Sequence, residues 1–69
     1  MSVYTILSRS DKGTAFIGTY SSFFRAERQV QYIFESQGLF LRNKIYSKNI
    51  IGYDSGDIVY EIYESVMDD

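Results

Sequence analysis

The chain of 69 residues contains no cysteine and no histidine. It therefore has no disulfide and no thiol nucleophile, and it lacks the commonest general base and the commonest ligand of transition metals. Small domains often depend on disulfides or a metal, so this one must be stabilised by packing or by self-association. We expect no enzyme activity, no catalytic residues, no metal site and no cofactor.

Proline is also absent, and no stretch rich in serine and glycine interrupts the chain. No linker is therefore predicted. A chain this short buries only roughly 60% of its unfolded surface, which leaves apolar area for one core. We expect a single small domain over residues 1–69.

Long apolar runs are missing as well. No segment approaches the roughly 20 apolar residues that a membrane span needs. The start, Met1–Tyr4, lacks the charged and apolar regions of a signal peptide. The expected location is the cytoplasm, with no membrane partner.

Hydrophobic residues make up 45% of the chain, with seven tyrosines and five phenylalanines, which is enough for a packed core. The charges are unevenly distributed. Seven basic residues and three acids lie before Asp54, whereas the residues from Asp54 onward hold six acids and no base. An acidic C-terminal part therefore follows a basic N-terminal part.

The first two segments predict a β-hairpin. Residues 3–8 and 14–20 are rich in β-branched and aromatic side chains, and a polar turn ending at Gly13 separates them. A helix is predicted next, because Ser21 and Ser22 are good N-cap residues and Gly38 is typical of a helix end. Its apolar stripe is formed by Phe23, Ala26, Val30, Ile33 and Phe34.

Phe24 lies about 100° away from Phe23 on such a helix, so it belongs at the margin of the stripe. We expect Phe24 to pack against the hairpin; the alternative is an exposed residue that anchors a partner.

The second half is predicted less uniformly. Residues 39–47 are either strand or connection, and strand character is expected near residues 44–51. A turn is predicted over residues 53–57 and a last strand over residues 58–64. In that strand one face, expected to be the drier, holds Ile58, Tyr60 and Ile62, and the other holds Val59, Glu61 and Tyr63.

These elements predict an α+β fold, an antiparallel sheet of three to four strands with one amphipathic helix packed on one face, in the order β-β-α-β-β. The other face would have no second layer. If Tyr4, Ile6, Val59 and Tyr63 lie there, that face is partly apolar, and it or a sheet edge would bind another protein or a second copy.

Little of the remaining sequence indicates a catalytic, metal-binding or phosphate-binding site. The carboxylate pairs Asp54 with Asp57 and Glu61 with Glu64 are typical of solvated turns and strand edges. The glycines form no phosphate-binding loop. Residues 21–22 suit helix capping better than anion binding.

The sequence contains two charged regions whose function has more than one interpretation. Basic residues interleaved with aromatics over residues 25–48 resemble a nucleic-acid surface in composition, but a pI near 4.9 argues against nucleic acid as a partner. The acidic end, with Glu61, Glu64 and Asp68, would steer the domain to a basic partner or mimic phosphates. The alternative is that it keeps the protein soluble.

The stretch Ile17–Ser22, followed by Ala26, Glu27 and Val30, resembles a broad group of small uncharacterised bacterial and phage domains. Their opening Val-Tyr strand matches Val3-Tyr4, and their acidic, tyrosine-containing last strand matches residues 60–64. The chain departs from the group at Phe23-Phe24 and in the long stretch over residues 38–57. The resemblance implies a phage accessory protein, a class that commonly binds and blocks a host protein.

The expected function is therefore that of a non-enzymatic binding protein that inhibits a host protein, such as a defence enzyme. The alternatives are an oligomeric domain that sequesters a nucleotide or similar anion, and a weak nucleic-acid-binding module. Aromatic and charged side chains dominate binding at interfaces. The candidate partner-binding residues are Arg25, Arg28, Tyr32, Tyr46, Tyr53, Glu61, Tyr63 and Glu64.

Overall fold

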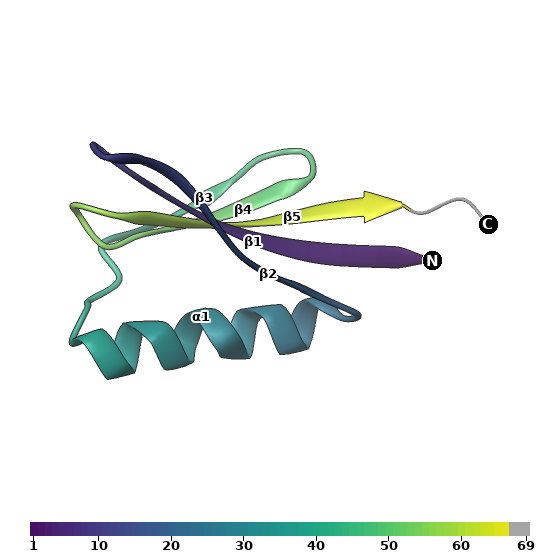
Figure 1. Ribbon diagram of the computed structural model, residues 1–69, viewed down its shortest axis with the longest axis horizontal. Helices are drawn as coiled ribbons and strands as arrows, with labels where there is room; N and C mark the ends of the chain where they lie inside the picture. The colour runs from purple at the N-terminus through teal and green to yellow at the C-terminus, as the bar shows by residue number, and fades with distance from the viewer. Residues whose placement is uncertain (67–69) are drawn as a thin grey trace.

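The computed structural model describes residues 1–66 and shows one antiparallel sheet with a single helix (Figure 1). The order of the strands across the sheet is β2-β1-β5-β4-β3. The elements are β1 (Ser2–Ser10), β2 (Gly13–Tyr20), α1 (Phe23–Gln37), β3 (Asn43–Tyr46), β4 (Ile50–Asp54) and β5 (Val59–Val66).

The α+β class, the hairpin and the helix are confirmed, but the predicted number of strands is wrong. Residues 1–66 form five strands, because the segment expected as one strand over residues 44–51 is a second hairpin. Its turn is closed by a hydrogen bond from the Ser47 amide to the Ile50 carbonyl, 2.9 Å long. The polar run over residues 47–49 is what divides the two strands.

The turn predicted at residues 53–57 begins later than expected, because β4 continues to Asp54. The Ser55 hydroxyl donates to the Ile58 carbonyl over 2.7 Å, and the Gly56 amide donates to a carboxylate oxygen of Asp54 over 2.8 Å. Gly56 has a φ of 107°, which a residue with a side chain rarely adopts. Asp54 therefore stabilises a turn, as its sequence context indicates.

Both predicted ends of the helix are confirmed. Ser22 is the N-cap, and its hydroxyl accepts a hydrogen bond of 3.2 Å from the Arg25 amide. At the other end Gly38 adopts a left-handed conformation with a φ of 65°. Its amide and that of Leu39 bond back to carbonyls of the last turn. The cap at Ser22 serves the helix backbone, as expected.

The core lies between α1 and the sheet. From the helix it takes the predicted stripe, with Phe23 only half-buried at the edge, and from the sheet it takes Ile6 and Ile62, which pair across β1 and β5. Among residues 1–66 the buried side chains are Ile6, Ala26, Val30, Ile33, Phe34, Tyr53, Tyr60 and Ile62. The predicted drier face of the last strand is confirmed by Tyr60 and Ile62.

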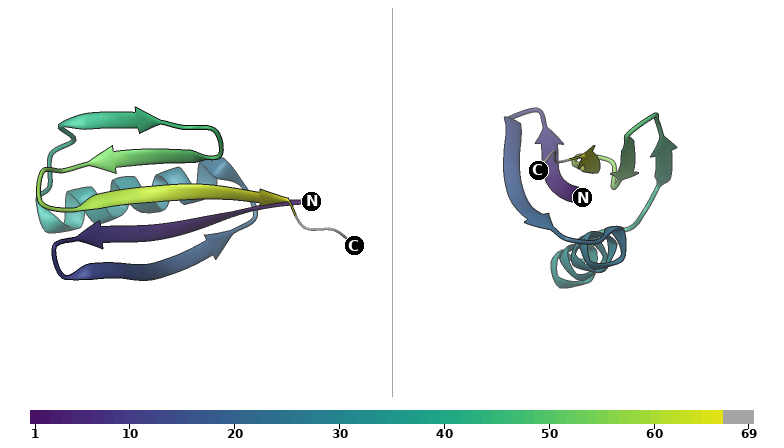
Figure 2. Two further views of the ribbon diagram at one scale, coloured as in Figure 1. Left: turned by 90° about the horizontal axis from the view of Figure 1, so that it is seen from above. Right: turned by 90° about the vertical axis from the view of Figure 1, so that its right-hand side faces the viewer.

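The helix covers only part of the sheet. It packs against β1, β5 and β2, whereas no Cα atom of β3 or β4 lies within 8 Å of a helix Cα atom. Figure 2 shows the helix crossing one face, with no segment of residues 1–66 over the other. This offset leaves a gap beside β3 and β4 and an uncovered helix face on the opposite side.

The open sheet face differs in part from its predicted composition. Tyr4 and Ile6 share the face that the helix covers, because their side chains alternate in step with the core, so their placement on the open face is wrong. Val59 and Tyr63 do lie on the open face. Its centre is polar, because the Arg9 guanidinium bonds to both Glu61 and the Tyr63 hydroxyl.

The capping bond predicts the effect of one substitution. Ser22→Ala should lower the free energy of unfolding by about 1 kcal/mol, because it leaves the Arg25 amide without its side-chain partner. Ser21→Ala is the matched control and should change stability by less than about 0.5 kcal/mol. Urea unfolding followed by circular dichroism measures both, and equal losses in the two variants would contradict the assignment of the cap.

Candidate functional site

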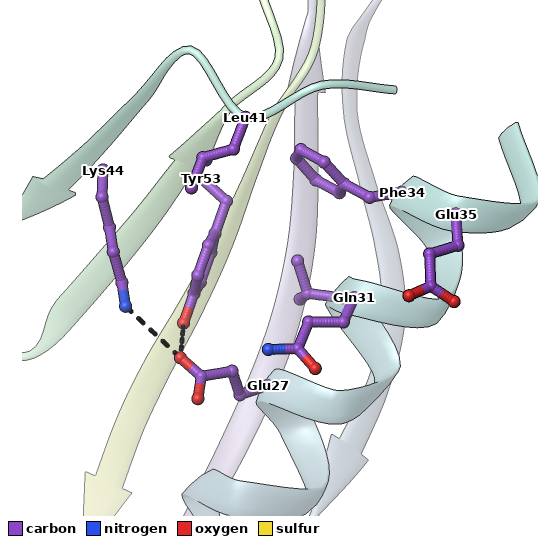
Figure 3. A pocket seen from close by; sticks show the side chains of 8 residues that line it. Glu27, Gln31, Phe34, Glu35, Leu41, Lys44 and Tyr53 are labelled. Carbon is purple, nitrogen blue, oxygen red and sulfur yellow. Dashed lines mark hydrogen bonds and ion pairs between the residues drawn. The ribbon is translucent and has the colours of Figure 1, made fainter. Parts of the chain in front are cut away.

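A pocket of about 260 Å³ lies in the gap between α1 and the β3–β4 hairpin (Figure 3). Helix α1 contributes the polar residues on this side of it. The segment between α1 and β3 contributes Leu41, and the hairpin contributes Lys44 and Tyr53. The floor is apolar and the rim is charged. The lining residues are Glu27, Val30, Gln31, Phe34, Glu35, Leu41, Lys44 and Tyr53.

Glu27 joins the helix to the hairpin across this pocket. One of its carboxylate oxygens accepts a hydrogen bond of 2.7 Å from the Tyr53 hydroxyl and lies 3.4 Å from the Lys44 ammonium group. The ammonium group also lies 5.2 Å from the ring centroid of Tyr53 and 5.6 Å from that of Tyr46. Lys44 is therefore held between two aromatic rings and a carboxylate.

The same contacts shift two pKa values upward. Burial, followed by the hydrogen bond to Glu27, raises the pKa of Tyr53 well above its ordinary value of 10.0. Burial lowers the pKa of Lys44, but Tyr46 and Glu27 together raise it by more, so the net shift is upward from 10.5. At neutral pH the phenol keeps its proton and the amine keeps its charge, so neither group is a ready nucleophile or base.

A second surface lies on the side of the helix near β2. We call it the helix patch, and it surrounds an open hollow of about 600 Å³. Phe24 and Tyr32 stand well out of the helix, with 66% and 64% of their surface exposed. The residues of the helix patch are Tyr20, Phe24, Arg25, Arg28, Gln29 and Tyr32.

The two arginines of the helix patch have no acidic partner among residues 1–66. The ion pairs in this part of the chain are Arg9 with Glu61 and Lys44 with Glu27. Arg28 instead lies over the ring of Phe24, with its guanidinium carbon 5.7 Å from the ring centroid. The helix patch is thus a positively charged and aromatic surface in a protein whose net charge is −2.

The structure brings only some of the predicted partner-binding residues together. Arg25, Arg28 and Tyr32 share the helix patch. Tyr46 is 69% exposed beside Lys44, whereas Tyr53 is only 5% exposed. Tyr53 was a candidate because tyrosines are common at interfaces, but burial under the helix edge removes it from the surface.

The acidic candidates already have partners inside the chain. Glu61 pairs with Arg9 and also accepts a bond of 3.3 Å from the Tyr63 hydroxyl. Glu64 accepts bonds from the Ser2 and Tyr4 hydroxyls at 3.1 and 3.4 Å. These contacts hold β5 to β1. Asp68, which was named with Glu61 and Glu64 in the acidic end of the chain, lies outside the described residues.

Phe24 is the patch residue that the sequence argument placed incorrectly. It does not pack against the hairpin but stands exposed, which was the alternative. The spacing of Phe24, Arg28 and Tyr32 at every fourth residue indicates one helix face and was a usable signal. No sequence pattern indicates the Glu27–Tyr53 contact, because the two residues are 26 positions apart in the chain.

No family model, curated protein or solved structure matches the chain. In the part of the chain that the structure describes, α1 is too short to cross a membrane. The acidic side chains of residues 1–66 form no group of three that could hold a metal ion. Any function must therefore be inferred from the chemistry of the pocket and of the helix patch.

The Tyr53–Glu27 contact predicts how stability depends on alkaline pH. An unfolded chain loses the tyrosine proton near pH 10, whereas the folded chain keeps it because the pKa of Tyr53 is raised. The contribution of this group is therefore complete below about pH 10 and is lost as the pH rises above that value. Tyr53→Phe should lower the free energy of unfolding by about 1–2 kcal/mol at pH 7. It should also make the loss of stability at alkaline pH less steep.

Urea unfolding between about pH 8 and pH 11 measures this effect, because that range spans the titration of an unfolded tyrosine. Tyr32→Phe, at an exposed position, is the control and should follow the wild-type curve. An alkaline fall in Tyr53→Phe as steep as in the wild type would show that another group is responsible.

Proposed function

We propose that the protein is a non-enzymatic binding protein that inhibits another protein, and that the helix patch is its contact surface. In the form that the sequence resemblance favours, it is a phage accessory protein that acts in the host cytoplasm. Its target would be a host protein such as a defence enzyme. The observation that carries the proposal is the pair of arginines that have no acidic partner among residues 1–66 and lie beside two exposed aromatic rings.

Folding of the domain does not require this arrangement. The core faces of α1 and the sheet are complete without Phe24 and Tyr32, which lie outside it. Exposed apolar and aromatic patches on a protein surface commonly mark a site of interaction. Arginine and tyrosine are enriched among the residues that dominate binding energy at interfaces. These side chains are therefore best explained by a partner.

The charge of the helix patch indicates what that partner presents. Within the described part of the chain, the hollow is lined by two arginines and by no acid. Arginine binds carboxylates with two parallel hydrogen bonds, and its flat face stacks on aromatic rings. The partner should therefore present an acidic segment with an apolar or aromatic residue that fits between Phe24 and Tyr32. Binding should weaken as salt increases.

The first test compares two double variants in their affinity for the protein captured from the host lysate. Phe24→Ala with Arg28→Ala removes an aromatic ring and an arginine from the helix patch. Phe40→Ala with Arg42→Ala removes the same residue types from the exposed connection between α1 and β3, and it is the matched control. The patch variant should lose affinity at least about tenfold, and the control should stay near wild type.

Both double variants remove exposed side chains, so each should keep a stable fold, which thermal unfolding checks. Equal affinity of the two variants for the captured protein would contradict the role of the helix patch.

A second candidate function is supported by the same hollow. Two guanidinium groups near three aromatic rings also suit a nucleotide or a similar anion, which associated copies of the chain would sequester. Nucleic acid is less favoured, because the net charge is −2.

Thermal unfolding with a nucleoside diphosphate separates the two candidates. If the protein sequesters nucleotides, the melting temperature should rise by several degrees, because ligand binding stabilises the native state. Arg25→Gln with Arg28→Gln should abolish that rise. No shift at millimolar nucleotide would exclude the second candidate and leave protein binding.

A further inference from the structure

Strand β2 has an unusual sequence for the edge of a sheet. It lies at one end of the strand order and pairs with β1 alone, so its other side presents unpaired backbone groups. Over its eight residues, Gly13–Tyr20, it contains no charged residue and no proline. Natural proteins normally place such residues on edge strands to prevent pairing with another chain.

The other edge strand shows the usual protection. β3 has only four residues and includes Lys44. β2 is twice as long and has one irregularity, a shift of register that leaves Ile17 without a partner in β1. The residues on either side of this bulge remain in regular antiparallel pairing with β1. Most of β2 therefore keeps the extended backbone that another strand can pair with at the edge of the sheet.

Exposed apolar side chains accompany this free edge. Phe16 is 66% exposed, and Ile17 beside it is also exposed. Phe16 pairs with Leu7 and so lies on the open sheet face, opposite the helix. An aromatic ring at an uncharged sheet edge gains burial when another strand is added beside it.

We propose that β2 pairs with β2 of a second copy of the chain, antiparallel across a two-fold axis, which makes one continuous sheet of ten strands. The strand is uncharged, so pairing it with itself brings no like charges together. Antiparallel pairing of identical strands is compatible with two-fold symmetry and continues the antiparallel pattern of the sheet.

The size of the core favours a second copy over a foreign strand. Eight side chains are buried in the described part of the chain, and no disulfide or histidine-based metal site can supplement them. Small domains without such constraints commonly gain stability by oligomerisation. A second copy of the chain is present whenever the protein is made, whereas a strand of another protein is not. This inference does not rest on the proposed function.

The symmetry makes Phe16 the residue to change. In the register that pairs Phe16 with its own copy, the two Phe16 rings lie at the two-fold axis and next to each other on the open face. A lysine there would place two positive charges at the axis. Charged edge residues are the usual means of preventing such pairing.

Sedimentation equilibrium over a range of concentrations tests the proposal. The wild type should approach a mass about twice the 8.0 kDa of one chain, and Phe16→Lys should remain at the mass of one chain. Phe40→Lys makes the same change at an exposed phenylalanine outside the sheet and should behave as the wild type.

Hydrogen exchange of the wild type adds a readout that needs no variant. Amides of β2 should exchange more slowly at high than at low protein concentration, while those of β3 should not change. A wild-type mass of one chain at millimolar concentration would overturn the proposal. So would open-ended growth beyond two copies, or equal masses for Phe16→Lys and Phe40→Lys.

Discussion

The packing of α1 across β1 and β5 is the contact on which the rest of the molecule depends. Val30 and Ala26 of the helix meet Ile6 and Ile62 of the two central strands, and these four side chains are almost completely buried. One helix cannot cover five strands. Its position over β1, β5 and β2 therefore decides which side chains remain outside, and both candidate sites lie along its two flanks.

The two flanks differ in how their charges are satisfied. On the flank facing β3 and β4, Glu27 has a partner in Tyr53 and another in Lys44, so this carboxylate joins the helix to the hairpin. On the flank facing β2, Arg25 and Arg28 have no acidic partner among the described residues. The uneven charge of the chain has a structural counterpart, because the acids of β5 are bonded within the sheet while these arginines remain available.

Much of the fold could be predicted because its signals are local. The caps at Ser22 and Gly38, the apolar stripe of α1 and the alternation in β5 each depend on residues close in sequence. The β3–β4 hairpin was missed because its turn contains neither glycine nor proline. The burial of Tyr53 depends on where the helix lies over the sheet, which no local pattern determines.

The candidate site was predictable to a similar extent. Arg25, Arg28 and Tyr32 could be chosen by residue type and helical spacing. The lack of an acid near the two arginines is a property of the folded arrangement, because it depends on the direction in which Glu27 points.

The central claim, that the helix patch is the recognition surface, is tested most directly by site-specific photo-crosslinking. A photoreactive phenylalanine analogue is placed at Tyr32 in one variant and at Tyr46 in another, two tyrosines of similar exposure on opposite flanks of the helix. With the captured partner present, a crosslinked complex should form from position 32 and none from position 46. A crosslink from position 46 and none from position 32 would contradict it.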